Sequence, residues 1–268
     1  MERRKWQAVR SVSIASEMNP TMRQTMEDAM VIEDTFAGSS GQGLFAVLDG
    51  HGGRGVVEFV QQHLARAVAR ELRSNDEAST EKRIRRAFMN VDMESRHIET
   101  SGTTAAVCFL RCDASSSADV STRTLCAANV GDARAVLCQD GKAVRVTKDH
   151  KATDADEKRR IERLGGFVLR GRVCGLLAVG RAFGDHALKQ FVPAHPYYSE
   201  TKLGNRERHP FFIVACDGVW DVMSDQDAVD IVLQAKSASQ RAQAAQMLVD
   251  EAMERNSTDN ITAMVVFL

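Results

Sequence analysis

The order of the predicted elements indicates an α+β protein in which helices pack on antiparallel sheets. Helical periodicity occurs in two neighbouring pairs of segments, 55–73 with 80–99 and 224–235 with 237–254, and strand-like segments are grouped between the pairs. A parallel sheet would require strands and helices that alternate one by one. The grouping therefore favours antiparallel sheets over a β-α-β fold.

The first helix is predicted from apolar residues that recur every three or four positions. From Gly55 to Arg73 these residues would form one buried face, made of Val57, Val60, Leu64, Val68 and Leu72. A less regular spacing predicts the second helix from Ile84, Phe88, Val91 and Ile98.

Two later helices are predicted from their start signals. Asp154 and Glu157 have the spacing of a capping box at the start of a short charged helix. Ser237 and Gln240 have the same spacing, and they predict a helix that runs to about Glu254.

Six strands are predicted from short apolar runs that turn residues close. They cover residues 44–49, 103–110, 124–130, 134–138, 211–216 and 261–268. The turn Val130-Gly131-Asp132-Ala133 is expected to join the third and fourth of these strands as a hairpin.

Composition argues against several classes of protein. The chain has 268 residues and a formal net charge of −1, so no strong field would recruit nucleic acid or an acidic membrane. The basic start lacks an apolar core of signal-peptide length, and no run approaches the ~18 apolar residues of a membrane helix. The cysteines form no C-x-x-C pair, which argues against a zinc site or a disulfide framework and favours reduced thiols in a cytosolic or nuclear protein. They are Cys108, Cys112, Cys126, Cys138, Cys174 and Cys216.

Three aspartates stand at the ends of predicted buried strands. Asp49 closes the run Leu44–Asp49 and Asp217 follows a second run, whereas Asp259 comes just before the last strand. An ionised carboxylate at a buried strand end is costly unless it is paired or bound to a metal. The recurrence predicts one shared acidic site.

Two plainer interpretations compete with this one. Asp-Gly also favours a turn, so each aspartate taken alone is more often a turn residue. The run Gly50–Gly55 matches the dinucleotide pattern G-x-G-x-x-G, with Glu71 near the expected distance. We reject the dinucleotide interpretation because Glu71 falls inside a predicted helix, and because Asp49 would place a negative charge beside the pyrophosphate.

Carboxylates from several strand ends and turns could together bind a hard divalent cation such as Mg²⁺, which takes oxygen ligands. The candidates are Glu27, Asp28, Asp49, Asp132, Asp217, Asp221 and Asp259. A carboxylate that bridges two ions about 3.5–4 Å apart would build a two-metal hydrolytic centre.

Two further residues suggest phosphate chemistry at the same edge. His51 lies on the glycine-rich bend after Asp49, and its unperturbed pKa of about 6.5 suits an acid or base near neutral pH. Arg23 precedes Glu27, and an arginine near a metal site can hold two phosphate oxygens. The plain alternatives are a surface histidine and a solvated loop charge.

Nearly the whole chain, from about Ser13 to Leu268, resembles the type 2C metal-dependent protein serine/threonine phosphatases. The family's motifs occur in family order, and the ordered series is far more specific than any single motif. They are R-x-x-M-E-D at 23–28, F-A-V-L-D-G-H-G-G at 45–53, S-G-T-T-A at 101–105, N-V-G-D-A-R at 129–134, D-H-K at 149–151, R-x-x-x-x-G-G near 160–166, R-A-F-G-D at 181–185, A-C-D-G-V-W-D at 215–221 and D-N at 259–260.

This resemblance implies a single catalytic domain over 1–268, built as a central antiparallel β-sandwich with helices on both outer faces, a four-layer αββα arrangement. It implies direct attack on phosphoserine or phosphothreonine of proteins by a metal-activated water, with no phospho-enzyme intermediate. Asp49 would bridge two Mg²⁺ or Mn²⁺ ions. The other protein ligands would be Glu27, the Gly50 carbonyl, Asp217 and Asp259, with Asp132, Asp217 and Asp221 at a third, looser ion.

The resemblance also assigns phosphate binding to Arg23 and general-acid catalysis to His51. Departures from the pattern are few: Ala152 stands where a proline is common, and Gly180 where a serine is common. Segment 186–210 is the least family-like, and it falls where the family has a variable flap beside the active site. We therefore expect this segment to contribute to substrate choice.

Two alternative functions compete with this one. A cysteine-based phosphatase is disfavoured because none of the six cysteines has an arginine six positions later. An inactive family member that acts as a scaffold or regulatory subunit would be expected to lose metal ligands, and this chain keeps those that can be matched. We expect phosphoprotein substrates, no nucleic-acid or membrane partner, a monomer, and a cytoplasmic or nuclear location.

Overall fold

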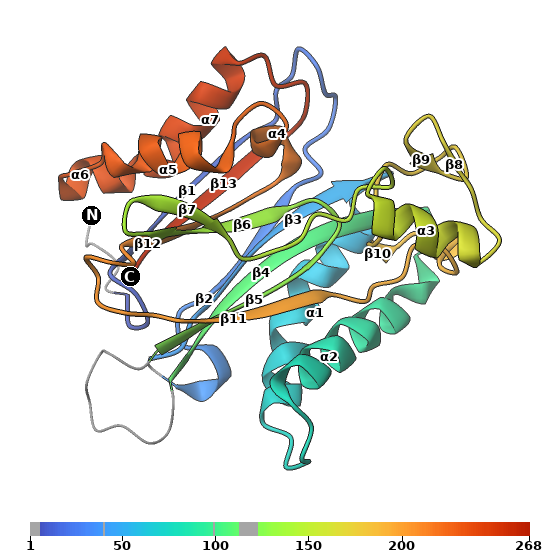
Figure 1. The fold of residues 1–268 in the computed structure, drawn as a ribbon, viewed down its shortest axis with the longest axis horizontal. Coiled ribbons are helices and arrows are strands. Elements are labelled where there is room, and N and C mark those ends of the chain that lie inside the picture. The colour runs from blue at the N-terminus through green and yellow to red at the C-terminus, as the bar shows by residue number, and fades with distance from the viewer. Residues whose placement is uncertain (1–5, 40, 99, 113–122) are drawn as a thin grey trace.

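The structure is a computed structural model that describes residues 6–39, 41–98, 100–112 and 123–268. Two antiparallel sheets pack face to face, and helices cover the outer face of each (Figure 1). Helices α1 and α2 lie on one outer face, and α5, α6 and α7 lie on the other. The predicted α+β sandwich with helices on both outer faces is confirmed.

The strands of both sheets come from distant parts of the chain, and neighbouring strands run antiparallel. One sheet has the order β1 (Ser11–Glu17), β13 (Ile261–Phe267), β12 (Phe211–Ala215), β6 (Arg134–Gln139) and β7 (Lys142–Arg145). The other has the order β11 (Tyr197–Lys202), β5 (Arg123–Val130), β4 (Gly102–Cys112), β3 (Leu44–His51) and β2 (Ala29–Glu33), with β10 (Phe183–Gly184) paired to β4.

The helices fall into two outer layers and one smaller unit. The layers consist of α1 (Gly55–Leu72) and α2 (Thr80–Glu94) on one side, and of α4 (Asp217–Trp220), α5 (Asp225–Leu233), α6 (Ala238–Ala242) and α7 (Ala244–Glu254) on the other. The smaller unit contains α3 (Ala155–Arg163) and a hairpin of β8 (Val168–Leu169) and β9 (Arg172–Val173). Short 3-10 helices are η1 (Phe36–Gly38), η2 (Ser95–His97) and η4 (His186–Leu188).

Strand β3 shows how the layers are sorted by alternation. Leu44, Ala46 and Leu48 pack in the cluster beneath α1 and α2, whereas Phe45 and Val47 belong to the cluster between the two sheets. Successive strand side chains point to opposite faces, so a strand covered on both faces is apolar throughout. Burial of each leucine, valine or phenylalanine side chain of this strand contributes about 1.5–3 kcal/mol to stability.

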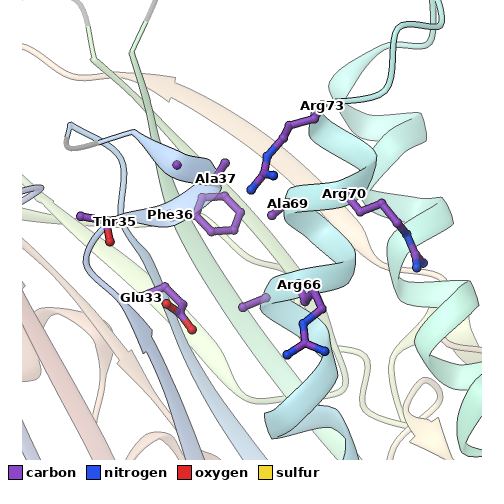
Figure 2. Close-up of a pocket in the computed structure, with 10 residues that line it drawn as sticks. Glu33, Thr35, Phe36, Ala37, Arg66, Ala69, Arg70 and Arg73 are labelled. Carbon is purple, nitrogen blue, oxygen red and sulfur yellow. The ribbon is translucent and has the colours of Figure 1, made fainter.

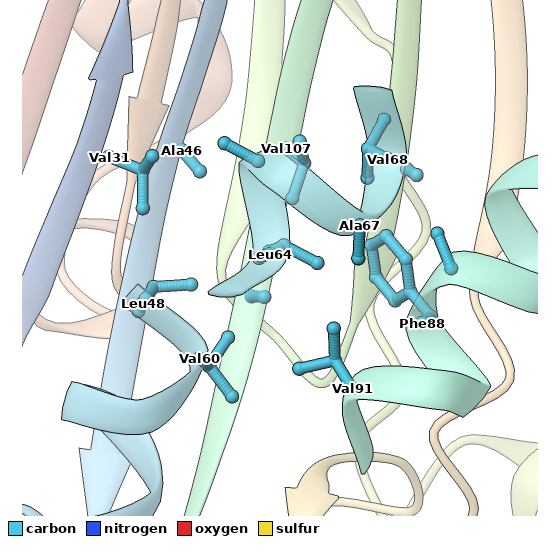
Figure 3. Close-up of a cluster of buried hydrophobic side chains, with 14 of the residues drawn as sticks. Val31, Ala46, Leu48, Val60, Leu64, Ala67, Val68, Phe88, Val91 and Val107 are labelled. Atoms are coloured by element: carbon cyan, nitrogen blue, oxygen red, sulfur yellow. The ribbon is translucent and has the colours of Figure 1, made fainter. Parts of the chain in front are cut away.

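Helix α1 packs its predicted apolar stripe onto this sheet. Val57, Val60, Leu64 and Val68 are fully buried, and Figure 3 shows the last three together with Phe88 and Val91 of α2. Only residues 52–54 separate the end of β3 from the start of α1.

The predicted hairpin at 130–133 is wrong. Strand β5 pairs with β4 and β11, whereas β6 pairs with β12 and β7, so this turn carries the chain from one sheet to the other. Gly131 makes the crossing with φ +84 and lies so close to Thr104 that a Cβ would meet its side chain at 2.5 Å. Both strands are buried on both faces, so their sequence pattern does not distinguish one sheet from two.

The start signals of the later helices are confirmed, but one helix is interrupted. Asp154 accepts hydrogen bonds from the backbone of residues 156 and 157, and Ser237 forms a capping box with Gln240. The helix predicted to run from Ser237 to Glu254 is split at Gln243 into α6 and α7. None of the helices among the described residues combines the length and the apolarity that a membrane crossing requires.

Candidate active site

Three aspartates from different elements converge at one end of the sandwich. Asp49 lies near the end of β3, Asp132 lies in the turn between β5 and β6, and Asp217 begins α4 just after β12. One carboxylate oxygen from each lies within 4.8 Å of the others. Hard cations such as Mg²⁺ and Mn²⁺ bind carboxylate oxygens in this way, so the donor set fits a divalent ion.

The three carboxylates make an electrostatically costly arrangement. Burial, and then repulsion by neighbouring acids, raises the pKa of Asp49 well above its ordinary value and that of Asp217 to about 8. Burial also raises the pKa of Asp132 to about 6, although Lys151, whose Nζ is 3.9 Å away, opposes this effect. A cation bound among the carboxylates would relieve the repulsion.

These aspartates line a cavity of about 460 Å³ that also contains most of the other predicted site residues. Its walls include Arg23, Thr25, Glu27, Asp49, Gly50, His51, Gly52, Thr104, Asp132, Asp217, Asp259 and Asn260. Residues far apart in the chain therefore meet here, as the interpretation of the strand ends predicted.

The loop that carries Arg23 and Glu27 is fixed by Asn260, a residue to which sequence reasoning gave no role. The Asn260 side chain accepts a hydrogen bond from the Glu27 backbone at 2.9 Å and donates to the Met18 and Thr25 carbonyls at 2.8 and 3.0 Å. Its position directly after Asp259 in the D-N pair was the available signal.

Arg23 and Asp259 contact each other directly at the mouth of the cavity. The guanidinium forms an ion pair with the carboxylate, and Arg23 Nε also donates to the Thr258 carbonyl at 3.3 Å. The Arg23 side chain is 49% exposed and that of Asp259 is 29% exposed. Both groups are therefore accessible to a ligand from solvent.

Asp28 is a buried acid near this end of the sandwich. It is 5% exposed, and its Oδ2 has no hydrogen-bond partner among the described residues. Burial raises its pKa to about 6, although hydrogen bonds with Thr262 and Cys216 act in the opposite direction. It is not among the residues that line the cavity.

Asp221 does not line the cavity. Its carboxylate accepts a hydrogen bond from Lys151 Nζ at 2.6 Å, and its side chain is 54% exposed. Lys151 also lies 3.9 Å from Asp132, so this lysine connects Asp221 to the edge of the acidic group.

His51 contacts Asp185, a residue to which sequence reasoning gave no role. The ring Nε2 lies 2.9 and 3.0 Å from the two carboxylate oxygens of Asp185. The only sequence signal was its place at the end of the R-A-F-G-D motif. The contact fixes the orientation of the imidazole at the cavity wall.

On the side of the smaller unit, the cavity wall is formed by residues of 172–179 and not by the segment 186–210 that was expected beside the active site. The flap was expected at 186–210, but Tyr197–Lys202 is β11, an edge strand paired with β5. No residue of 186–210 lines the cavity, and Arg172, Leu177, Ala178 and Val179 stand there instead. Strand β11 was missed because its exposed, polar side chains carry no apolar signal.

A second cavity of about 460 Å³ has the opposite charge. It lies between η1 and α1, over a floor that contains the buried ring of Phe36. Figure 2 shows the Arg73 side chain directed towards Phe36 and Ala37, with Arg66 on the side of Glu33. Among the described residues neither arginine forms an ion pair, and both are exposed to solvent.

Comparisons with known proteins identify the family of the chain. Residues 13–261 match the family profile described as Protein phosphatase 2C. The chain is 41% identical over 258 residues to Protein phosphatase 2C homolog 1 of Schizosaccharomyces pombe, covering 95% of this chain and 72% of that protein. It is 36% identical over 266 residues to Protein phosphatase 2C homolog 1 of Saccharomyces cerevisiae, covering 96% of this chain and 93% of that protein.

A solved structure shares the fold across its whole length. Serine-threonine phosphatase 2C from Toxoplasma gondii superposes with a TM-score of 0.80 at 24% identity, covering 98% of this chain and 96% of that one. The structural match supports the four-layer architecture, and the sequence matches establish the relationship. The chain therefore belongs to the protein phosphatase 2C family and is a protein serine/threonine phosphatase that acts on phosphoproteins.

Proposed function

We propose that this phosphatase hydrolyses phosphoserine and phosphothreonine in proteins with Mg²⁺ or Mn²⁺ ions held in the acidic cavity, by direct attack of water and without a phospho-enzyme intermediate. The observation that carries the proposal is the convergence of Asp49, Asp132 and Asp217, whose carboxylate oxygens lie within 4.8 Å. When bound, the ions would lower the pKa of the attacking water and neutralise charge on the phosphoryl oxygens.

The remaining ligands follow from the cavity wall. Glu27, the Gly50 carbonyl and Asp259 would complete the set for two ions, with Asp49 between them, and all three residues line the same cavity. Asp221 would contribute only to a third, weaker ion. It would first have to exchange the Lys151 ammonium, which it now contacts at 2.6 Å.

Arg23 would hold two oxygens of the substrate phosphate through its planar guanidinium. In the structure this guanidinium is paired with Asp259. Binding of a cation by Asp259 and of a phosphate by Arg23 would replace that pair with two new ones. This exchange accounts for an exposed arginine beside a proposed metal ligand.

His51 would donate a proton to the departing serine or threonine oxygen. Such oxygens are poor leaving groups, so protonation in the transition state accelerates their departure, typically by 10²–10⁴-fold. The carboxylate of Asp185 holds the imidazole at 2.9 Å and so limits its rotation. The proton donor is thereby presented at the wall of the cavity that also holds the acids.

The test is metal-dependent turnover of a phosphoserine peptide and of p-nitrophenyl phosphate. We expect activity with added Mn²⁺, loss of activity with a chelator, and recovery when Mn²⁺ is restored. Asp49→Asn should abolish turnover while its circular dichroism spectrum stays that of the wild type. Activity that persists in the chelator would contradict the metal mechanism, and a wild-type protein that shows no turnover with Mn²⁺ would favour the scaffold alternative.

A further inference from the structure

His51 and Asp185 meet across a glycine. Strand β4 runs between β3 and β10, and its Gly102 is in register with His51 on one side and with Gly184 on the other. A Cβ on Gly102 would lie 2.4 Å from His51 Nε2 and 2.2 Å from Asp185 Oδ2. Because Gly102 has no side chain, the imidazole can reach over the strand to the carboxylate.

The backbone that presents Asp185 is an unfavourable one. Asp185 has φ +48, and the preceding Gly184 has φ +72. A left-handed conformation at a non-glycine residue persists only where the surrounding contacts hold it. Strand β10 has two residues and, among the described residues, pairs with β4. The Asp185 backbone also donates to the Ser101 carbonyl at 3.0 Å and accepts from the Leu188 N–H at 2.8 Å.

Asp92 supplies a second set of contacts from α2, which packs against β10 (Figure 1). Asp92 is 4% exposed, and its Oδ1 accepts hydrogen bonds from the Gly184 backbone at 2.9 Å and from Lys189 Nζ at 2.8 Å. Lys189 also donates to the Ala182 carbonyl at 3.1 Å. The Asp92–Lys189 pair therefore holds β10 at residues on both sides of Phe183.

We propose that Asp92, with Lys189, is a positioning residue for proton transfer: it fixes β10, β10 fixes Asp185, and Asp185 orients His51. The inference rests on the proposed role of His51 as proton donor. Asp92 does not line the acidic cavity, so it would act through its contacts with β10 and Lys189. A buried carboxylate bonded to both an ammonium and a backbone N–H resists displacement, because each bond lost would leave a charge unpaired in the interior.

The prediction concerns leaving-group dependence, because only poor leaving groups need a proton. Asp92→Ala should lower kcat on a phosphoserine peptide by about tenfold or more, and on p-nitrophenyl phosphate by less than about threefold. Asp92→Asn keeps an oxygen that can accept from Gly184, and it should restore part of the loss. Lys189→Met should show the same selectivity, and it serves if Asp92→Ala does not fold.

A double-mutant cycle separates positioning from plain destabilisation. In a His51→Ala background, Asp92→Ala should cost no further activity on the phosphoserine peptide, because the group that it positions is gone. Val249→Ala, a buried change in α7 on the opposite outer layer, is the control. It should lower stability, and its effect on either substrate should be equal in both backgrounds.

The outcomes are distinguishable. If His51→Ala lowers activity on the peptide selectively but Asp92→Ala is unselective or multiplies with it, the positioning role is wrong and the proton donor stands. If His51→Ala itself shows no selectivity for the poor leaving group, the proposed proton donor is wrong and the positioning role falls with it.

Discussion

Glu157 and the three clustered aspartates of the acidic cavity differ in their charged partners. Glu157 contacts two arginines directly, whereas Asp49, Asp132 and Asp217 lie close to one another, with Lys151 at 3.9 Å from Asp132. The Glu157 side chain is 1% exposed and accepts from Arg181 at 2.6 Å and from Arg160 at 2.7 Å. Burial alone would raise its pKa, yet the hydrogen bonds from Arg181 and Arg160 lower it. This acid is a structural element that joins α3 to segment 180–181.

In the acidic cavity Arg23 pairs with Asp259 and Lys151 lies near Asp132, but among the described residues Asp49 and Asp217 form no ion pair. Burial and repulsion by Asp132 raise the pKa of Asp217. Burial, and then repulsion by Asp217, raises the pKa of Asp49 well above its ordinary value. Repulsion of this kind destabilises the fold, and it fits the proposed binding of a cation among these acids. Glu157, which is paired with arginines, therefore stabilises the fold, whereas Asp49, Asp132 and Asp217 form the candidate metal site.

The largest expected effect tests the charge deficit directly. Asp217→Asn should lower kcat with saturating Mn²⁺ by about a thousandfold, or ~4 kcal/mol in the barrier. It should also remove the rise in melting temperature that Mn²⁺ gives the wild type. With chelator present the variant should melt higher than the wild type, because one repelling charge is gone, and each 1 kcal/mol gained raises Tm by about 2–4 °C.

Differential scanning fluorimetry with chelator or Mn²⁺ measures both shifts. A chelated variant that melts below the wild type would show that Asp217 supports the fold as Glu157 does. In that case the proposed difference between Glu157 and the aspartates of the cavity would be wrong.

Glu157→Gln should act in the opposite direction. Removal of one partner from a buried ion pair leaves the arginines uncompensated, and typically costs about 3 kcal/mol or more. Urea denaturation should show this loss whether or not Mn²⁺ is present. Asp156→Asn is the matched control on the same helix, since its carboxylate is 59% exposed and should contribute little. Equal midpoints for the two variants would mean that the Glu157 pairs are not stabilising.

The aspartates of the site could be predicted from the sequence because each stands where an apolar run meets a turn. Asp49, Asp217 and Asp259 interrupt a strongly apolar pattern, and a charge there needs an explanation. The family motifs added the order of the ligands. The contacts among these aspartates could not be predicted, because they depend on which strands share a sheet. Strands β5 and β6 are apolar on both faces, so their sequence pattern does not assign them to different sheets.

Asp185 escaped prediction for a different reason. Its position depends on a two-residue strand, on a left-handed backbone and on the register of His51 with Gly102 across β4. None of these produces a periodic signal. Strand β11, within segment 186–210, was not predicted for a related reason, because its sequence YYSETK carries no alternating apolar pattern.

A buried base without an acid partner offers a smaller test, by pH. His150 is 1% exposed, and burial, followed by repulsion from Arg181, lowers its pKa to about 3. The unfolded state, with an ordinary pKa of about 6.5, binds more protons below that pH, so the contribution of His150 to stability falls as the pH falls from 6.5 towards 3. The slope is at most about 1.4 kcal/mol per pH unit.

The test compares urea midpoints of the wild type and of His150→Asn at pH 7 and at pH 5. Because both proteins carry the same titrating aspartates, the difference between them isolates the contribution of His150. Asn keeps a donor that can reach the Gly131 carbonyl, which His150 Nδ1 contacts at 3.2 Å. The wild type should lose stability relative to the variant at pH 5. An unchanged difference would show that His150 is not held neutral by burial.

The smallest expected effect concerns the arginine cavity between η1 and α1 (Figure 2). Arg66 and Arg73 share a sign as the aspartates do, but water surrounds them, so neither needs a counter-ion. Arg66→Ala and Arg73→Ala should each change the free energy of unfolding by less than about 0.5 kcal/mol and leave kcat unchanged on p-nitrophenyl phosphate and on phosphoprotein. A rise in KM for phosphoprotein alone would contradict this expectation. It would show that the exposed arginines of this cavity contribute to binding of the phosphoprotein, as the buried aspartates are proposed to contribute to binding of the metal.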